Sequence, residues 1–428
     1  MVLYINGTSV GTNSSTTNVL TNATRSLGYR GDNNSAYFNG KIDQVRIYSS
    51  ALSSGDVTNL YNESSVPTAN LVAHYKLDGN ANDETTNYNG TWSGTEAYSD
   101  PAEFPTYNGT ATNVTYGYDG TPTNVSFVGT SFQPDLVWIK NRDKSPSYNL
   151  LFDSVRGATK WLSSNVADAE GTIASSLTSF DSNGFSLGAD PSGSNEGWNR
   201  NGDSHVAWCW KAGGSVTPNN NTDGTITSTV SANQDAGFSI VDFTSSATIS
   251  DTIGHGLSSA PEMIIYKRTN TTSNWTVYTN VIDGSWDYLR LNLTDAKGDS
   301  SLTWSTSSTI KNISTSGDWI AYCFHSVDGY QKVGSYTGNT TNPPTVSLGF
   351  QPRWILIKKA DSDTSFNHWN IFDTIRDGDN QLNKVLFASL YSEEVTFTSD
   401  YVDISTDGFT PNGGFNGNGI NHIYLAIA

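Results

Sequence analysis

The sequence has few basic residues, few cysteines and no long apolar run. Lys and Arg number 23 against 41 Asp and Glu, which gives a formal net charge of −18. Binding to nucleic acid or to an anionic membrane surface requires clustered cations, so neither partner is expected. No apolar stretch is long enough to cross a bilayer. The first ten residues, MVLYINGTSV, lack the basic start and apolar core of a signal peptide.

The chain is rich instead in aromatic and turn-forming residues. Its 428 residues include 12 Trp, 21 Tyr and 17 Phe, although hydrophobic residues make up only 36%. Large aromatic side chains bury much apolar area per residue, so the chain can still build a core. Abundant Gly, Asn, Ser and Thr favour many short strands joined by polar turns. We therefore expect an all-β protein, and the length suggests about three domains.

One phrase, a proline followed by an apolar strand, occurs three times. It reads SFQPDLVWIK, LSSAPEMIIYK and LGFQPRWILIK, with the prolines at Pro134, Pro261 and Pro352. Self-similarity of this kind indicates repeated structural units. Each copy ends in a second apolar strand, which is HVAWCW (205–210), WIAYCF (319–324) or HIYLAI (422–427).

Each copy is expected to be a β-sandwich. The continuous apolar runs LVWI and WILI are typical of strands buried on both faces. In the first closing strand the large residues Val206, Trp208 and Trp210 should share one face. The small residues Ala207 and Cys209 should share the other. We predict three jelly-roll-like sandwiches, at 113–214, 225–328 and 329–428.

The two cysteines occupy equivalent positions of two copies. Cys209 lies in HVAWCWK and Cys323 in WIAYCFH. Equivalent strands of separate domains should lie far apart, so no disulfide is expected. Each thiol is interpreted as a small buried hydrophobic group.

The first part of the chain contains strand, hairpin and helix signals. LYINGTSVG predicts a hairpin with an Asn-Gly turn. KIDQVRIY predicts a strand with Val45 and Ile47 facing inwards. Ser53 or Ser54 is expected to cap a short helix.

The segment FNGKIDQVRIYSSALSSGDVTNLY (38–61) resembles the closing part of a laminin-G, or concanavalin A-like, domain. The resemblance implies a partial sandwich at 1–66, and 67–112 is expected to be a short-strand linker. LVAHYKLDGNANDETTNYNGTW (71–92) resembles the opening strand of the same family. Three interpretations stay open: the N-terminal half of the domain is missing, residues 71–92 complete the fold in permuted order, or a neighbouring chain supplies the rest.

Residues 113–428 resemble a tandem domain that is common in marine bacteriophage genomes. The motifs that carry the resemblance include SFQPDLVWIK, LFDSVRG, HVAWCWKAGG and GYQKVGSYTGN. In those genomes the domain often lies beside laminin-G-like domains in tail fibres and other virion-surface proteins. The resemblance implies host recognition or virion architecture, and it brings no reaction with it.

No motif for catalysis or metal binding stands out. None of the six histidines is paired at H-x-x-H or H-E-x-x-H spacing. His205 and His422 begin equivalent strands, so structural hydrogen bonds are expected of them. Calcium is frequent in the laminin-G family, and Asp32, Asn33 and Asp43 are oxygen donors, but their spacing matches no defined loop. We expect no other cofactor and no catalytic residue.

Several charged residues are candidates for chemistry. An Asp-x-x-Arg motif occurs in the first and third copies, whereas the second copy has Thr279 and Ile282 there. A catalytic acid should not be missing from one copy in three, so turn-stabilising ion pairs are expected. The motif pairs are Asp153 with Arg156 and Asp373 with Arg376. The carboxylates Glu393, Glu394, Asp361 and Asp363 are expected to be solvated loop charges.

Two loops before closing strands suggest a glycan site. GWNRNGD (197–203) and GFNGNG (414–419) place an aromatic residue beside amides. Sugars rest their C–H groups on an aromatic face while polar side chains bind the hydroxyls. A turn with a packed aromatic residue is the alternative. The candidate glycan-binding residues are Trp198, Asn199, Arg200, Asn201, Phe415, Asn416 and Asn418.

The combined expectation is a bacteriophage virion-surface protein. It would be a tail fibre or receptor-binding component that adheres to host surface glycans without catalysis. Its partners would be the host glycan and other virion proteins, and fibre symmetry predicts a homotrimer. The alternatives are a secreted bacterial adhesin or carbohydrate-binding protein, a capsid decoration or stalk protein, and a polysaccharide depolymerase.

Overall fold

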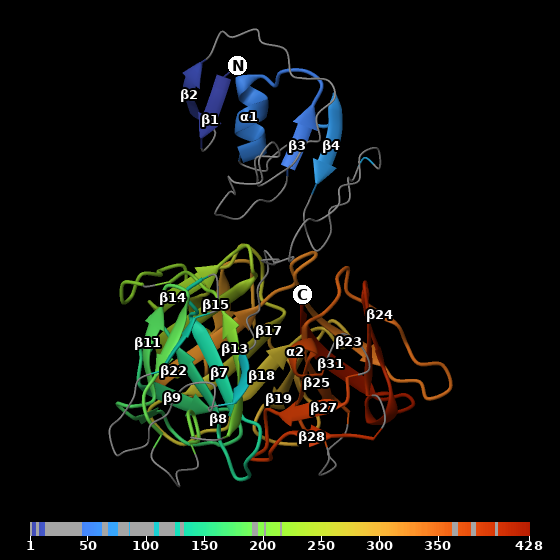
Figure 1. Cartoon of the computed structure of the whole chain (residues 1–428). Coiled ribbons are helices and arrows are strands. Elements are labelled where there is room, and N and C mark those ends of the chain that lie inside the picture. Colours follow the sequence, from blue (N-terminus) through green and yellow to red (C-terminus); the bar gives the residue numbers. More distant parts are fainter. Residues whose placement is uncertain are drawn as a thin grey trace. The chain divides into compact units, whose positions relative to one another are not determined.

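The chain folds into two compact units, residues 1–101 and 102–428. Strands dominate both units, which confirms the all-β class (Figure 1). None of the helices in the described part of the chain is both long and apolar enough to cross a membrane. The computed structural model describes residues 2–5, 8–12, 45–61, 67–75, 85, 107–110, 125–128, 132–190, 196–200, 203–214, 216–361, 367–377, 382–398 and 401–428.

Two antiparallel strand pairs lie among the described residues of the first unit. The predicted hairpin is formed by β1 (Val2–Ile5) and β2 (Thr8–Thr12). The laminin-G-like strand β3 (Val45–Tyr48) pairs with β4 (Leu71–Tyr75). β4 lies in the segment expected to be linker, and its pairing agrees with the permuted interpretation of residues 71–92.

The inward orientation predicted for Ile47 is wrong. Its side chain is 46% exposed. Val45, on the same face, is half-buried. Tyr48, on the opposite face, is also half-buried, and its hydroxyl donates to the carbonyl of Pro67 at 2.8 Å.

The one helix of the first unit's described residues, α1 (Ser54–Tyr61), begins after Ser53, as predicted. The Ser53 hydroxyl oxygen accepts from the N–H of Asp56 at 3.1 Å. In return the Asp56 carboxylate accepts from the N–H of Ser53, also at 3.1 Å. This reciprocal capping satisfies N–H groups that the helix leaves free.

The second unit contains three repeats, each with one large and one small antiparallel sheet. In spatial order the large sheet of the first repeat is β10 (Gly171–Thr172), β9 (Lys160–Ser163), β8 (Asn149–Asp153), β7 (Leu136–Asn141), β13 (Ser204–Trp210) and β5 (Tyr107–Thr110). The second is β14 (Thr229–Asn233), β15 (Phe238–Ser245), β22 (Gly317–Phe324), β17 (Met263–Arg268), β18 (Thr276–Thr279), β19 (Trp286–Arg290) and β20 (Gly298–Ser300). The third is β23 (Gln331–Thr337), β31 (Asn421–Ile427), β25 (Trp354–Lys359), β26 (Asn370–Asp373), β27 (Lys384–Phe387) and β28 (Val395–Thr396).

In the part of the second unit that the structure describes, the small sheets and two short helices complete the repeats. Strand β5 lies in the segment expected to be linker, so the first repeat already includes residues 107–110. The small sheets are β11 (Leu177–Asp181), β12 (Gly184–Leu187) and β6 (Val125–Val128), then β16 (Thr252–Gly254) and β21 (Thr309–Lys311), then β24 (Val346–Ser347), β30 (Gly408–Pro411) and β29 (Val402–Ser405). The helices are α2 (Thr374–Asp377) and the 3-10 turn η2 (Gly413–Phe415).

The central strands are buried on both faces, as their sequences predicted. All six residues of β7 are buried. In β13 the large residues Trp208 and Trp210 face one apolar cluster, and the small residues Ala207 and Cys209 face another. The alternation of large and small side chains therefore gives the predicted two faces.

The inner faces of the three large sheets share one apolar core. This cluster includes Trp208 from the first repeat, Tyr322 from the second and Leu425 from the third. A small apolar cavity of about 20 Å³ lies where the three faces meet. Each repeat also has a core of its own against its small sheet. The three repeats therefore pack into one body.

Candidate functional site: the polar junctions between the repeats

The three repeats close into a ring with pseudo-threefold symmetry. A backbone hydrogen bond joins each repeat to the next, and the third repeat bonds back to the first. Each acceptor lies eight residues after the proline of its repeat. The bonds run from the N–H of Glu170, Lys297 and Glu394 to the carbonyls of Thr269, Ala360 and Arg142, at 2.8, 2.7 and 2.9 Å. We call the three contact regions junction 1–2, junction 2–3 and junction 3–1.

A second set of hydrogen bonds repeats around the ring. At each junction a side-chain N–H crosses to a backbone carbonyl of the neighbouring repeat. Two of the donors are indoles and the third is an amide, so all three equivalent positions supply an N–H group. The bonds are Trp275 Nε1 to Ser163 O at 2.8 Å, Trp369 Nε1 to Arg290 O at 2.8 Å, and Asn149 Nδ2 to Phe387 O at 2.7 Å.

Three buried lysines, missed in the sequence, lie near the ends of the central strands. Lys140, Lys267 and Lys358 each stand six residues after a proline, at the end of the repeated phrase. Their ammonium groups donate to backbone carbonyls. Lys267 reaches Ala167 O of the first repeat at 3.1 Å, and Lys358 reaches Asp295 O of the second, also at 3.1 Å.

Burial changes the acidity of all three lysines. It lowers the pKa of Lys140 to about 7. It lowers the pKa of Lys358 to about 7 and that of Lys267 to about 8. Lys267 and Lys358, near the ends of β17 and β25, donate across a junction, so their ammonium groups hold loops of neighbouring repeats together. Lys140 donates to Ser147 O of its own repeat at 2.7 Å.

The Asp-x-x-Arg motifs form buried ion pairs, as predicted. The Arg376 Nε donates to Asp373 Oδ2 at 2.5 Å, and Arg156 Nε donates to Asp153 Oδ2 at 2.6 Å. In both motifs the arginine backbone N–H also donates to the carboxylate, at 2.9 Å. Each motif therefore closes its own turn.

Each of these carboxylates also accepts a hydrogen bond from the neighbouring repeat. Trp208 Nε1 donates to Asp373 Oδ2 at 3.1 Å at junction 3–1. The Tyr322 hydroxyl donates to Asp153 Oδ2 at 2.8 Å at junction 1–2. At junction 2–3 the corresponding residues are Thr279 and Leu425, so the acceptor and the donor are lost together.

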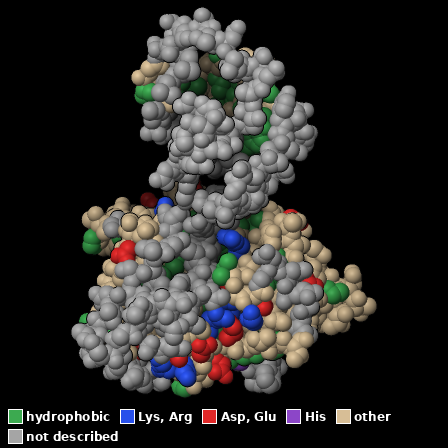
Figure 2. Space-filling model, viewed as in Figure 1, with side chains coloured by type: hydrophobic (Ala, Val, Ile, Leu, Met, Phe, Trp, Pro, Cys, Tyr) green, Lys and Arg blue, Asp and Glu red, His purple; other side chains and the backbone are tan. Residues whose placement is uncertain are grey.

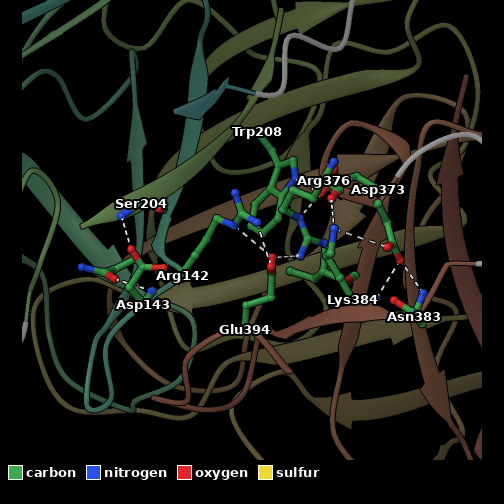
Figure 3. A network of polar contacts seen from close by, with 12 residues as sticks. Arg142, Asp143, Ser204, Trp208, Asp373, Arg376, Asn383, Lys384 and Glu394 are labelled. Atoms are coloured by element: carbon green, nitrogen blue, oxygen red, sulfur yellow. Dashed lines mark hydrogen bonds and ion pairs between the residues drawn. The ribbon is translucent and has the colours of Figure 1, made fainter. Parts of the chain in front are cut away.

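Glu394 extends the charged network at junction 3–1. Arg142 donates to both of its oxygens, at 2.9 and 2.7 Å, and Arg376 Nη1 donates at 2.7 Å. Figure 3 shows the carboxylate between the two guanidinium groups. The expectation of a solvated charge is wrong, because the side chain is only 12% exposed. Burial alone would raise the pKa of Glu394, but the bonds from Arg142 and the charge of Arg376 outweigh it and lower the pKa.

On the face drawn in Figure 2, acidic and basic side chains of residues 102–428 lie next to one another. The ion pairs of junction 3–1 follow the same pattern. Charges of opposite sign that satisfy one another give little attraction for a charged partner.

The two aromatic residues of the candidate glycan loops are buried. Trp198 is 1% exposed and Phe415 is 6% exposed. The Trp198 indole donates to Gly188 O at 3.3 Å, and Phe415 packs edge-on against Phe372. A buried ring cannot stack on a sugar, so the alternative of a turn with a packed aromatic residue describes both loops.

The polar residues of these loops are largely occupied by their neighbours. Asn199 donates to Gly188 O at 2.8 Å. Asn416 exchanges hydrogen bonds with the backbone of Asn339, at 2.7 and 2.8 Å. Arg200 lies 3.9 Å from the Asp203 carboxylate. Asn418 is exposed, and Asn201 lies outside the described residues.

The histidines and cysteines have the structural roles predicted for them. His205 Nε2 and His422 Nδ1 both contact backbone carbonyls, at 3.0 Å. Cys209 and Cys323 are free and buried in the cores of different repeats.

The structure describes some of the remaining loop carboxylates, but not the candidate calcium ligands. Asp361 accepts from the N–H of Asn421 at 3.0 Å. Glu393 is exposed. Within the described ranges, no group of three His, Cys, Asp or Glu is placed to hold a metal ion. The possible calcium ligands Asp32, Asn33 and Asp43, with Asp363, lie outside those ranges.

Two family models match the sequence. The first is described as Domain of unknown function (DUF7483) and matches residues 109–428. The second is described as Concanavalin A-like lectin/glucanases superfamily and matches residues 1–58, which confirms the laminin-G-like resemblance. No curated protein and no solved structure gives a match.

Proposed function

We propose a function on the premise that the chain belongs to the family described as Domain of unknown function (DUF7483), whose model covers residues 109–428. In this proposal the protein is a bacteriophage virion-surface component, such as a tail fibre, that adheres to host glycans without catalysis. The resemblance of residues 113–428 to a tandem domain of marine phage genomes supports the viral setting. The concanavalin A-like segment at 1–58 supports glycan adhesion, because its superfamily description names lectins.

The observation that carries the non-catalytic part is the use of charge at the junctions. Asp153, Asp373 and Glu394 each accept bonds from an arginine, and the two aspartates also accept from an aromatic N–H or O–H of the neighbouring repeat. General acid–base catalysis needs a carboxyl group within hydrogen-bond reach of a substrate. These three carboxylates bind groups of the protein itself and hold the repeats together, which suits a rigid display platform.

The proposed partners are a host surface glycan and other virion proteins. Fibres are usually closed symmetric oligomers, so the proposal includes a homotrimer of the 46.2 kDa chain. Native mass spectrometry tests this part: a trimer supports the fibre, and a monomer removes it.

The test of adhesion is binding to an array of bacterial surface polysaccharides, with a parallel assay for new reducing ends. The full chain is expected to bind at least one polysaccharide and to release no reducing ends. Release of reducing ends would contradict non-catalytic adhesion and favour a polysaccharide depolymerase instead. Absence of binding across the array would replace it by a decoration or stalk protein.

A second candidate function, polysaccharide cleavage, has one observation in its favour. Burial, helped by the charge of Asp153, raises the pKa of Asp242 on β15 to about 6. Such a value suits a general acid, although a glycosidase also needs a second carboxylate across the bond that is cut. If reducing ends are released, the variant Asp242→Asn should abolish the release.

A further inference from the structure

Two tyrosines from different repeats lie side by side at junction 3–1. Tyr148 precedes β8 and Tyr391 precedes β28. Their ring centroids are 5.5 Å apart with an interplanar angle of 39°. Tyr391 is 37% exposed, more than any other aromatic side chain whose exposure the structure describes. Trp161 continues the row, 5.8 Å from Tyr148.

Junction 3–1 does not need these two aromatic side chains, because junction 1–2 has the same backbone hydrogen bond without them. At junction 3–1 the N–H of Ser147 donates to Tyr391 O at 3.0 Å. At junction 1–2 the N–H of Ser273 donates to Ala167 O at 2.8 Å. Ala167 therefore takes the place of Tyr391, and Asn274 takes the place of Tyr148. Equal backbone geometry with small side chains shows that packing alone does not require the tyrosine pair.

The charges of two carboxylates act on the pair. Burial raises the pKa of Tyr148, and the charges of Asp168 and Glu196 raise it further. Burial and the charge of Asp168 also raise the pKa of Tyr391. Both phenols are therefore neutral near pH 7, and the charged groups that raise their pKa values are negative. Such charges repel acidic sugars and attract ammonium groups.

We propose that Tyr148 and Tyr391 form a stacking platform for a glycan made of neutral or amino sugars. The C–H face of a sugar ring packs on an aromatic face, and carboxylates accept hydrogen bonds from sugar hydroxyl and ammonium groups. Asp168 and Glu196, whose charges act on Tyr148, are the candidate acceptors. This inference rests on the proposed adhesion function and gives the second unit a glycan site of its own, separate from the concanavalin A-like segment.

The experiment titrates the full chain with four oligosaccharides: cellohexaose, maltohexaose, hexameric glucosamine and hexameric galacturonate. Isothermal titration calorimetry gives the affinity, and tryptophan emission reports on the row that contains Trp161. The test variant Tyr148→Asn with Tyr391→Ala reproduces the residues of junction 1–2. It is expected to bind the neutral or amino sugar at least tenfold more weakly than the wild type, with an unchanged urea midpoint.

Two controls keep the test sharp. Tyr288→Leu alters another partly exposed tyrosine, on β19, and should leave binding unchanged. Tyr391→Ala alone changes only the more exposed aromatic ring. If the double variant loses stability, this single variant replaces it in the test and is expected to bind the sugar more weakly than the wild type.

Five results are decisive. Failure of the wild type to bind any of the neutral or amino sugars overturns the inference, as does equal binding of galacturonate. Unchanged affinity in the double variant also overturns it. If the affinity is unchanged and the variant still binds polysaccharides on the array, glycan adhesion lies elsewhere in the chain, so the proposed function stands and this inference alone fails. A loss confined to the tyrosine variants supports the platform.

Discussion

The indole N–H of Trp208 donates a hydrogen bond to the carboxylate of Asp373 at 3.1 Å, across junction 3–1. Arg376 is paired with the same carboxylate and lies 5.9 Å from the centroid of the Trp208 ring. The three groups therefore form one buried unit that joins two repeats. Junction 2–3 lacks all three, since it has Thr279, Ile282 and Leu425 in their places.

Asp373→Ala is expected to be strongly destabilising. The substitution leaves the Arg376 guanidinium, whose side chain is 0% exposed, without its main partner. Removing one partner of a buried ion pair typically costs about 3–5 kcal/mol of unfolding free energy. Urea unfolding followed by tryptophan fluorescence measures the loss.

A matched variant of the same junction separates charge from packing. Trp208→Leu, Asp373→Thr and Arg376→Ile together reproduce junction 2–3. Since no buried charge is left unpaired at these positions, this triple variant should unfold at a higher urea concentration than Asp373→Ala. A triple variant that is less stable than the single one would show that the ion pair is not what the junction needs.

Glu394→Gln is expected to reduce stability most at neutral pH. Removing hydrogen bonds between charged groups costs about 1.5–3 kcal/mol. The pKa of Glu394 is lowered in the folded state, so its contribution is present above the unfolded value of about 4.3 and is lost as the pH falls through the folded value. Urea midpoints of wild type and variant should differ at pH 7 and converge at acid pH. A difference that stays constant with pH would contradict the role of the charge.

Lys140→Met is expected to be more stable than the wild type, by a margin that is largest at low pH. Burial lowers the pKa of Lys140 to about 7, whereas the unfolded value is about 10.4. The unfolded chain binds more protons between these values, so wild-type stability from this group rises with pH across that range. The advantage of the variant should therefore be largest at pH 6.5 and shrink by pH 9.5. Lys144→Met, at an exposed position, is the control and should show no such trend.

Trp198→Ala and Phe415→Ala are expected to act through stability rather than through a ligand. Both side chains fill repeat cores, and truncation of a buried Phe or Trp costs about 3–5 kcal/mol. Thermal unfolding should show the loss for each variant. A variant of normal stability that no longer binds glycan would restore these loops as a binding site.

The two thiols are expected to be unreactive in the folded chain. Burial raises the pKa of Cys209 and raises that of Cys323 to about 12. A thiol reagent should label neither residue in native buffer and both in urea. Labelling of Cys323 in the folded state would show that the second repeat opens.

Local patterns in the sequence were enough to predict the central strands and their two faces, although not the exposed side of Ile47 on β3. The alternation in β13 placed Trp208 and Cys209 on opposite faces, because a strand has a period of two wherever it lies. The Asp-x-x-Arg pairs and the Ser53 cap were also predictable, since their partners are three residues apart.

The closure of the ring could not be predicted from the sequence. Trp208 and Asp373 are separated by 165 residues, and neither local sequence indicates that the two side chains are partners. Lys140 lies near the end of an apolar strand, where a lysine usually reaches solvent, yet it is buried and donates to the carbonyl of Ser147. The loop around Trp198 likewise has the same sequence whether the indole faces water or a core.

The closed ring is tested most directly by hydrogen exchange of three amides. The backbone N–H groups of Glu170, Lys297 and Glu394 each donate across a junction. If the ring is closed, these amides should exchange as slowly as those of the central strands β7, β17 and β25, because both open only with the whole unit. Exchange as fast as that of exposed loops at any of the three positions would contradict the ring and leave three separate sandwiches.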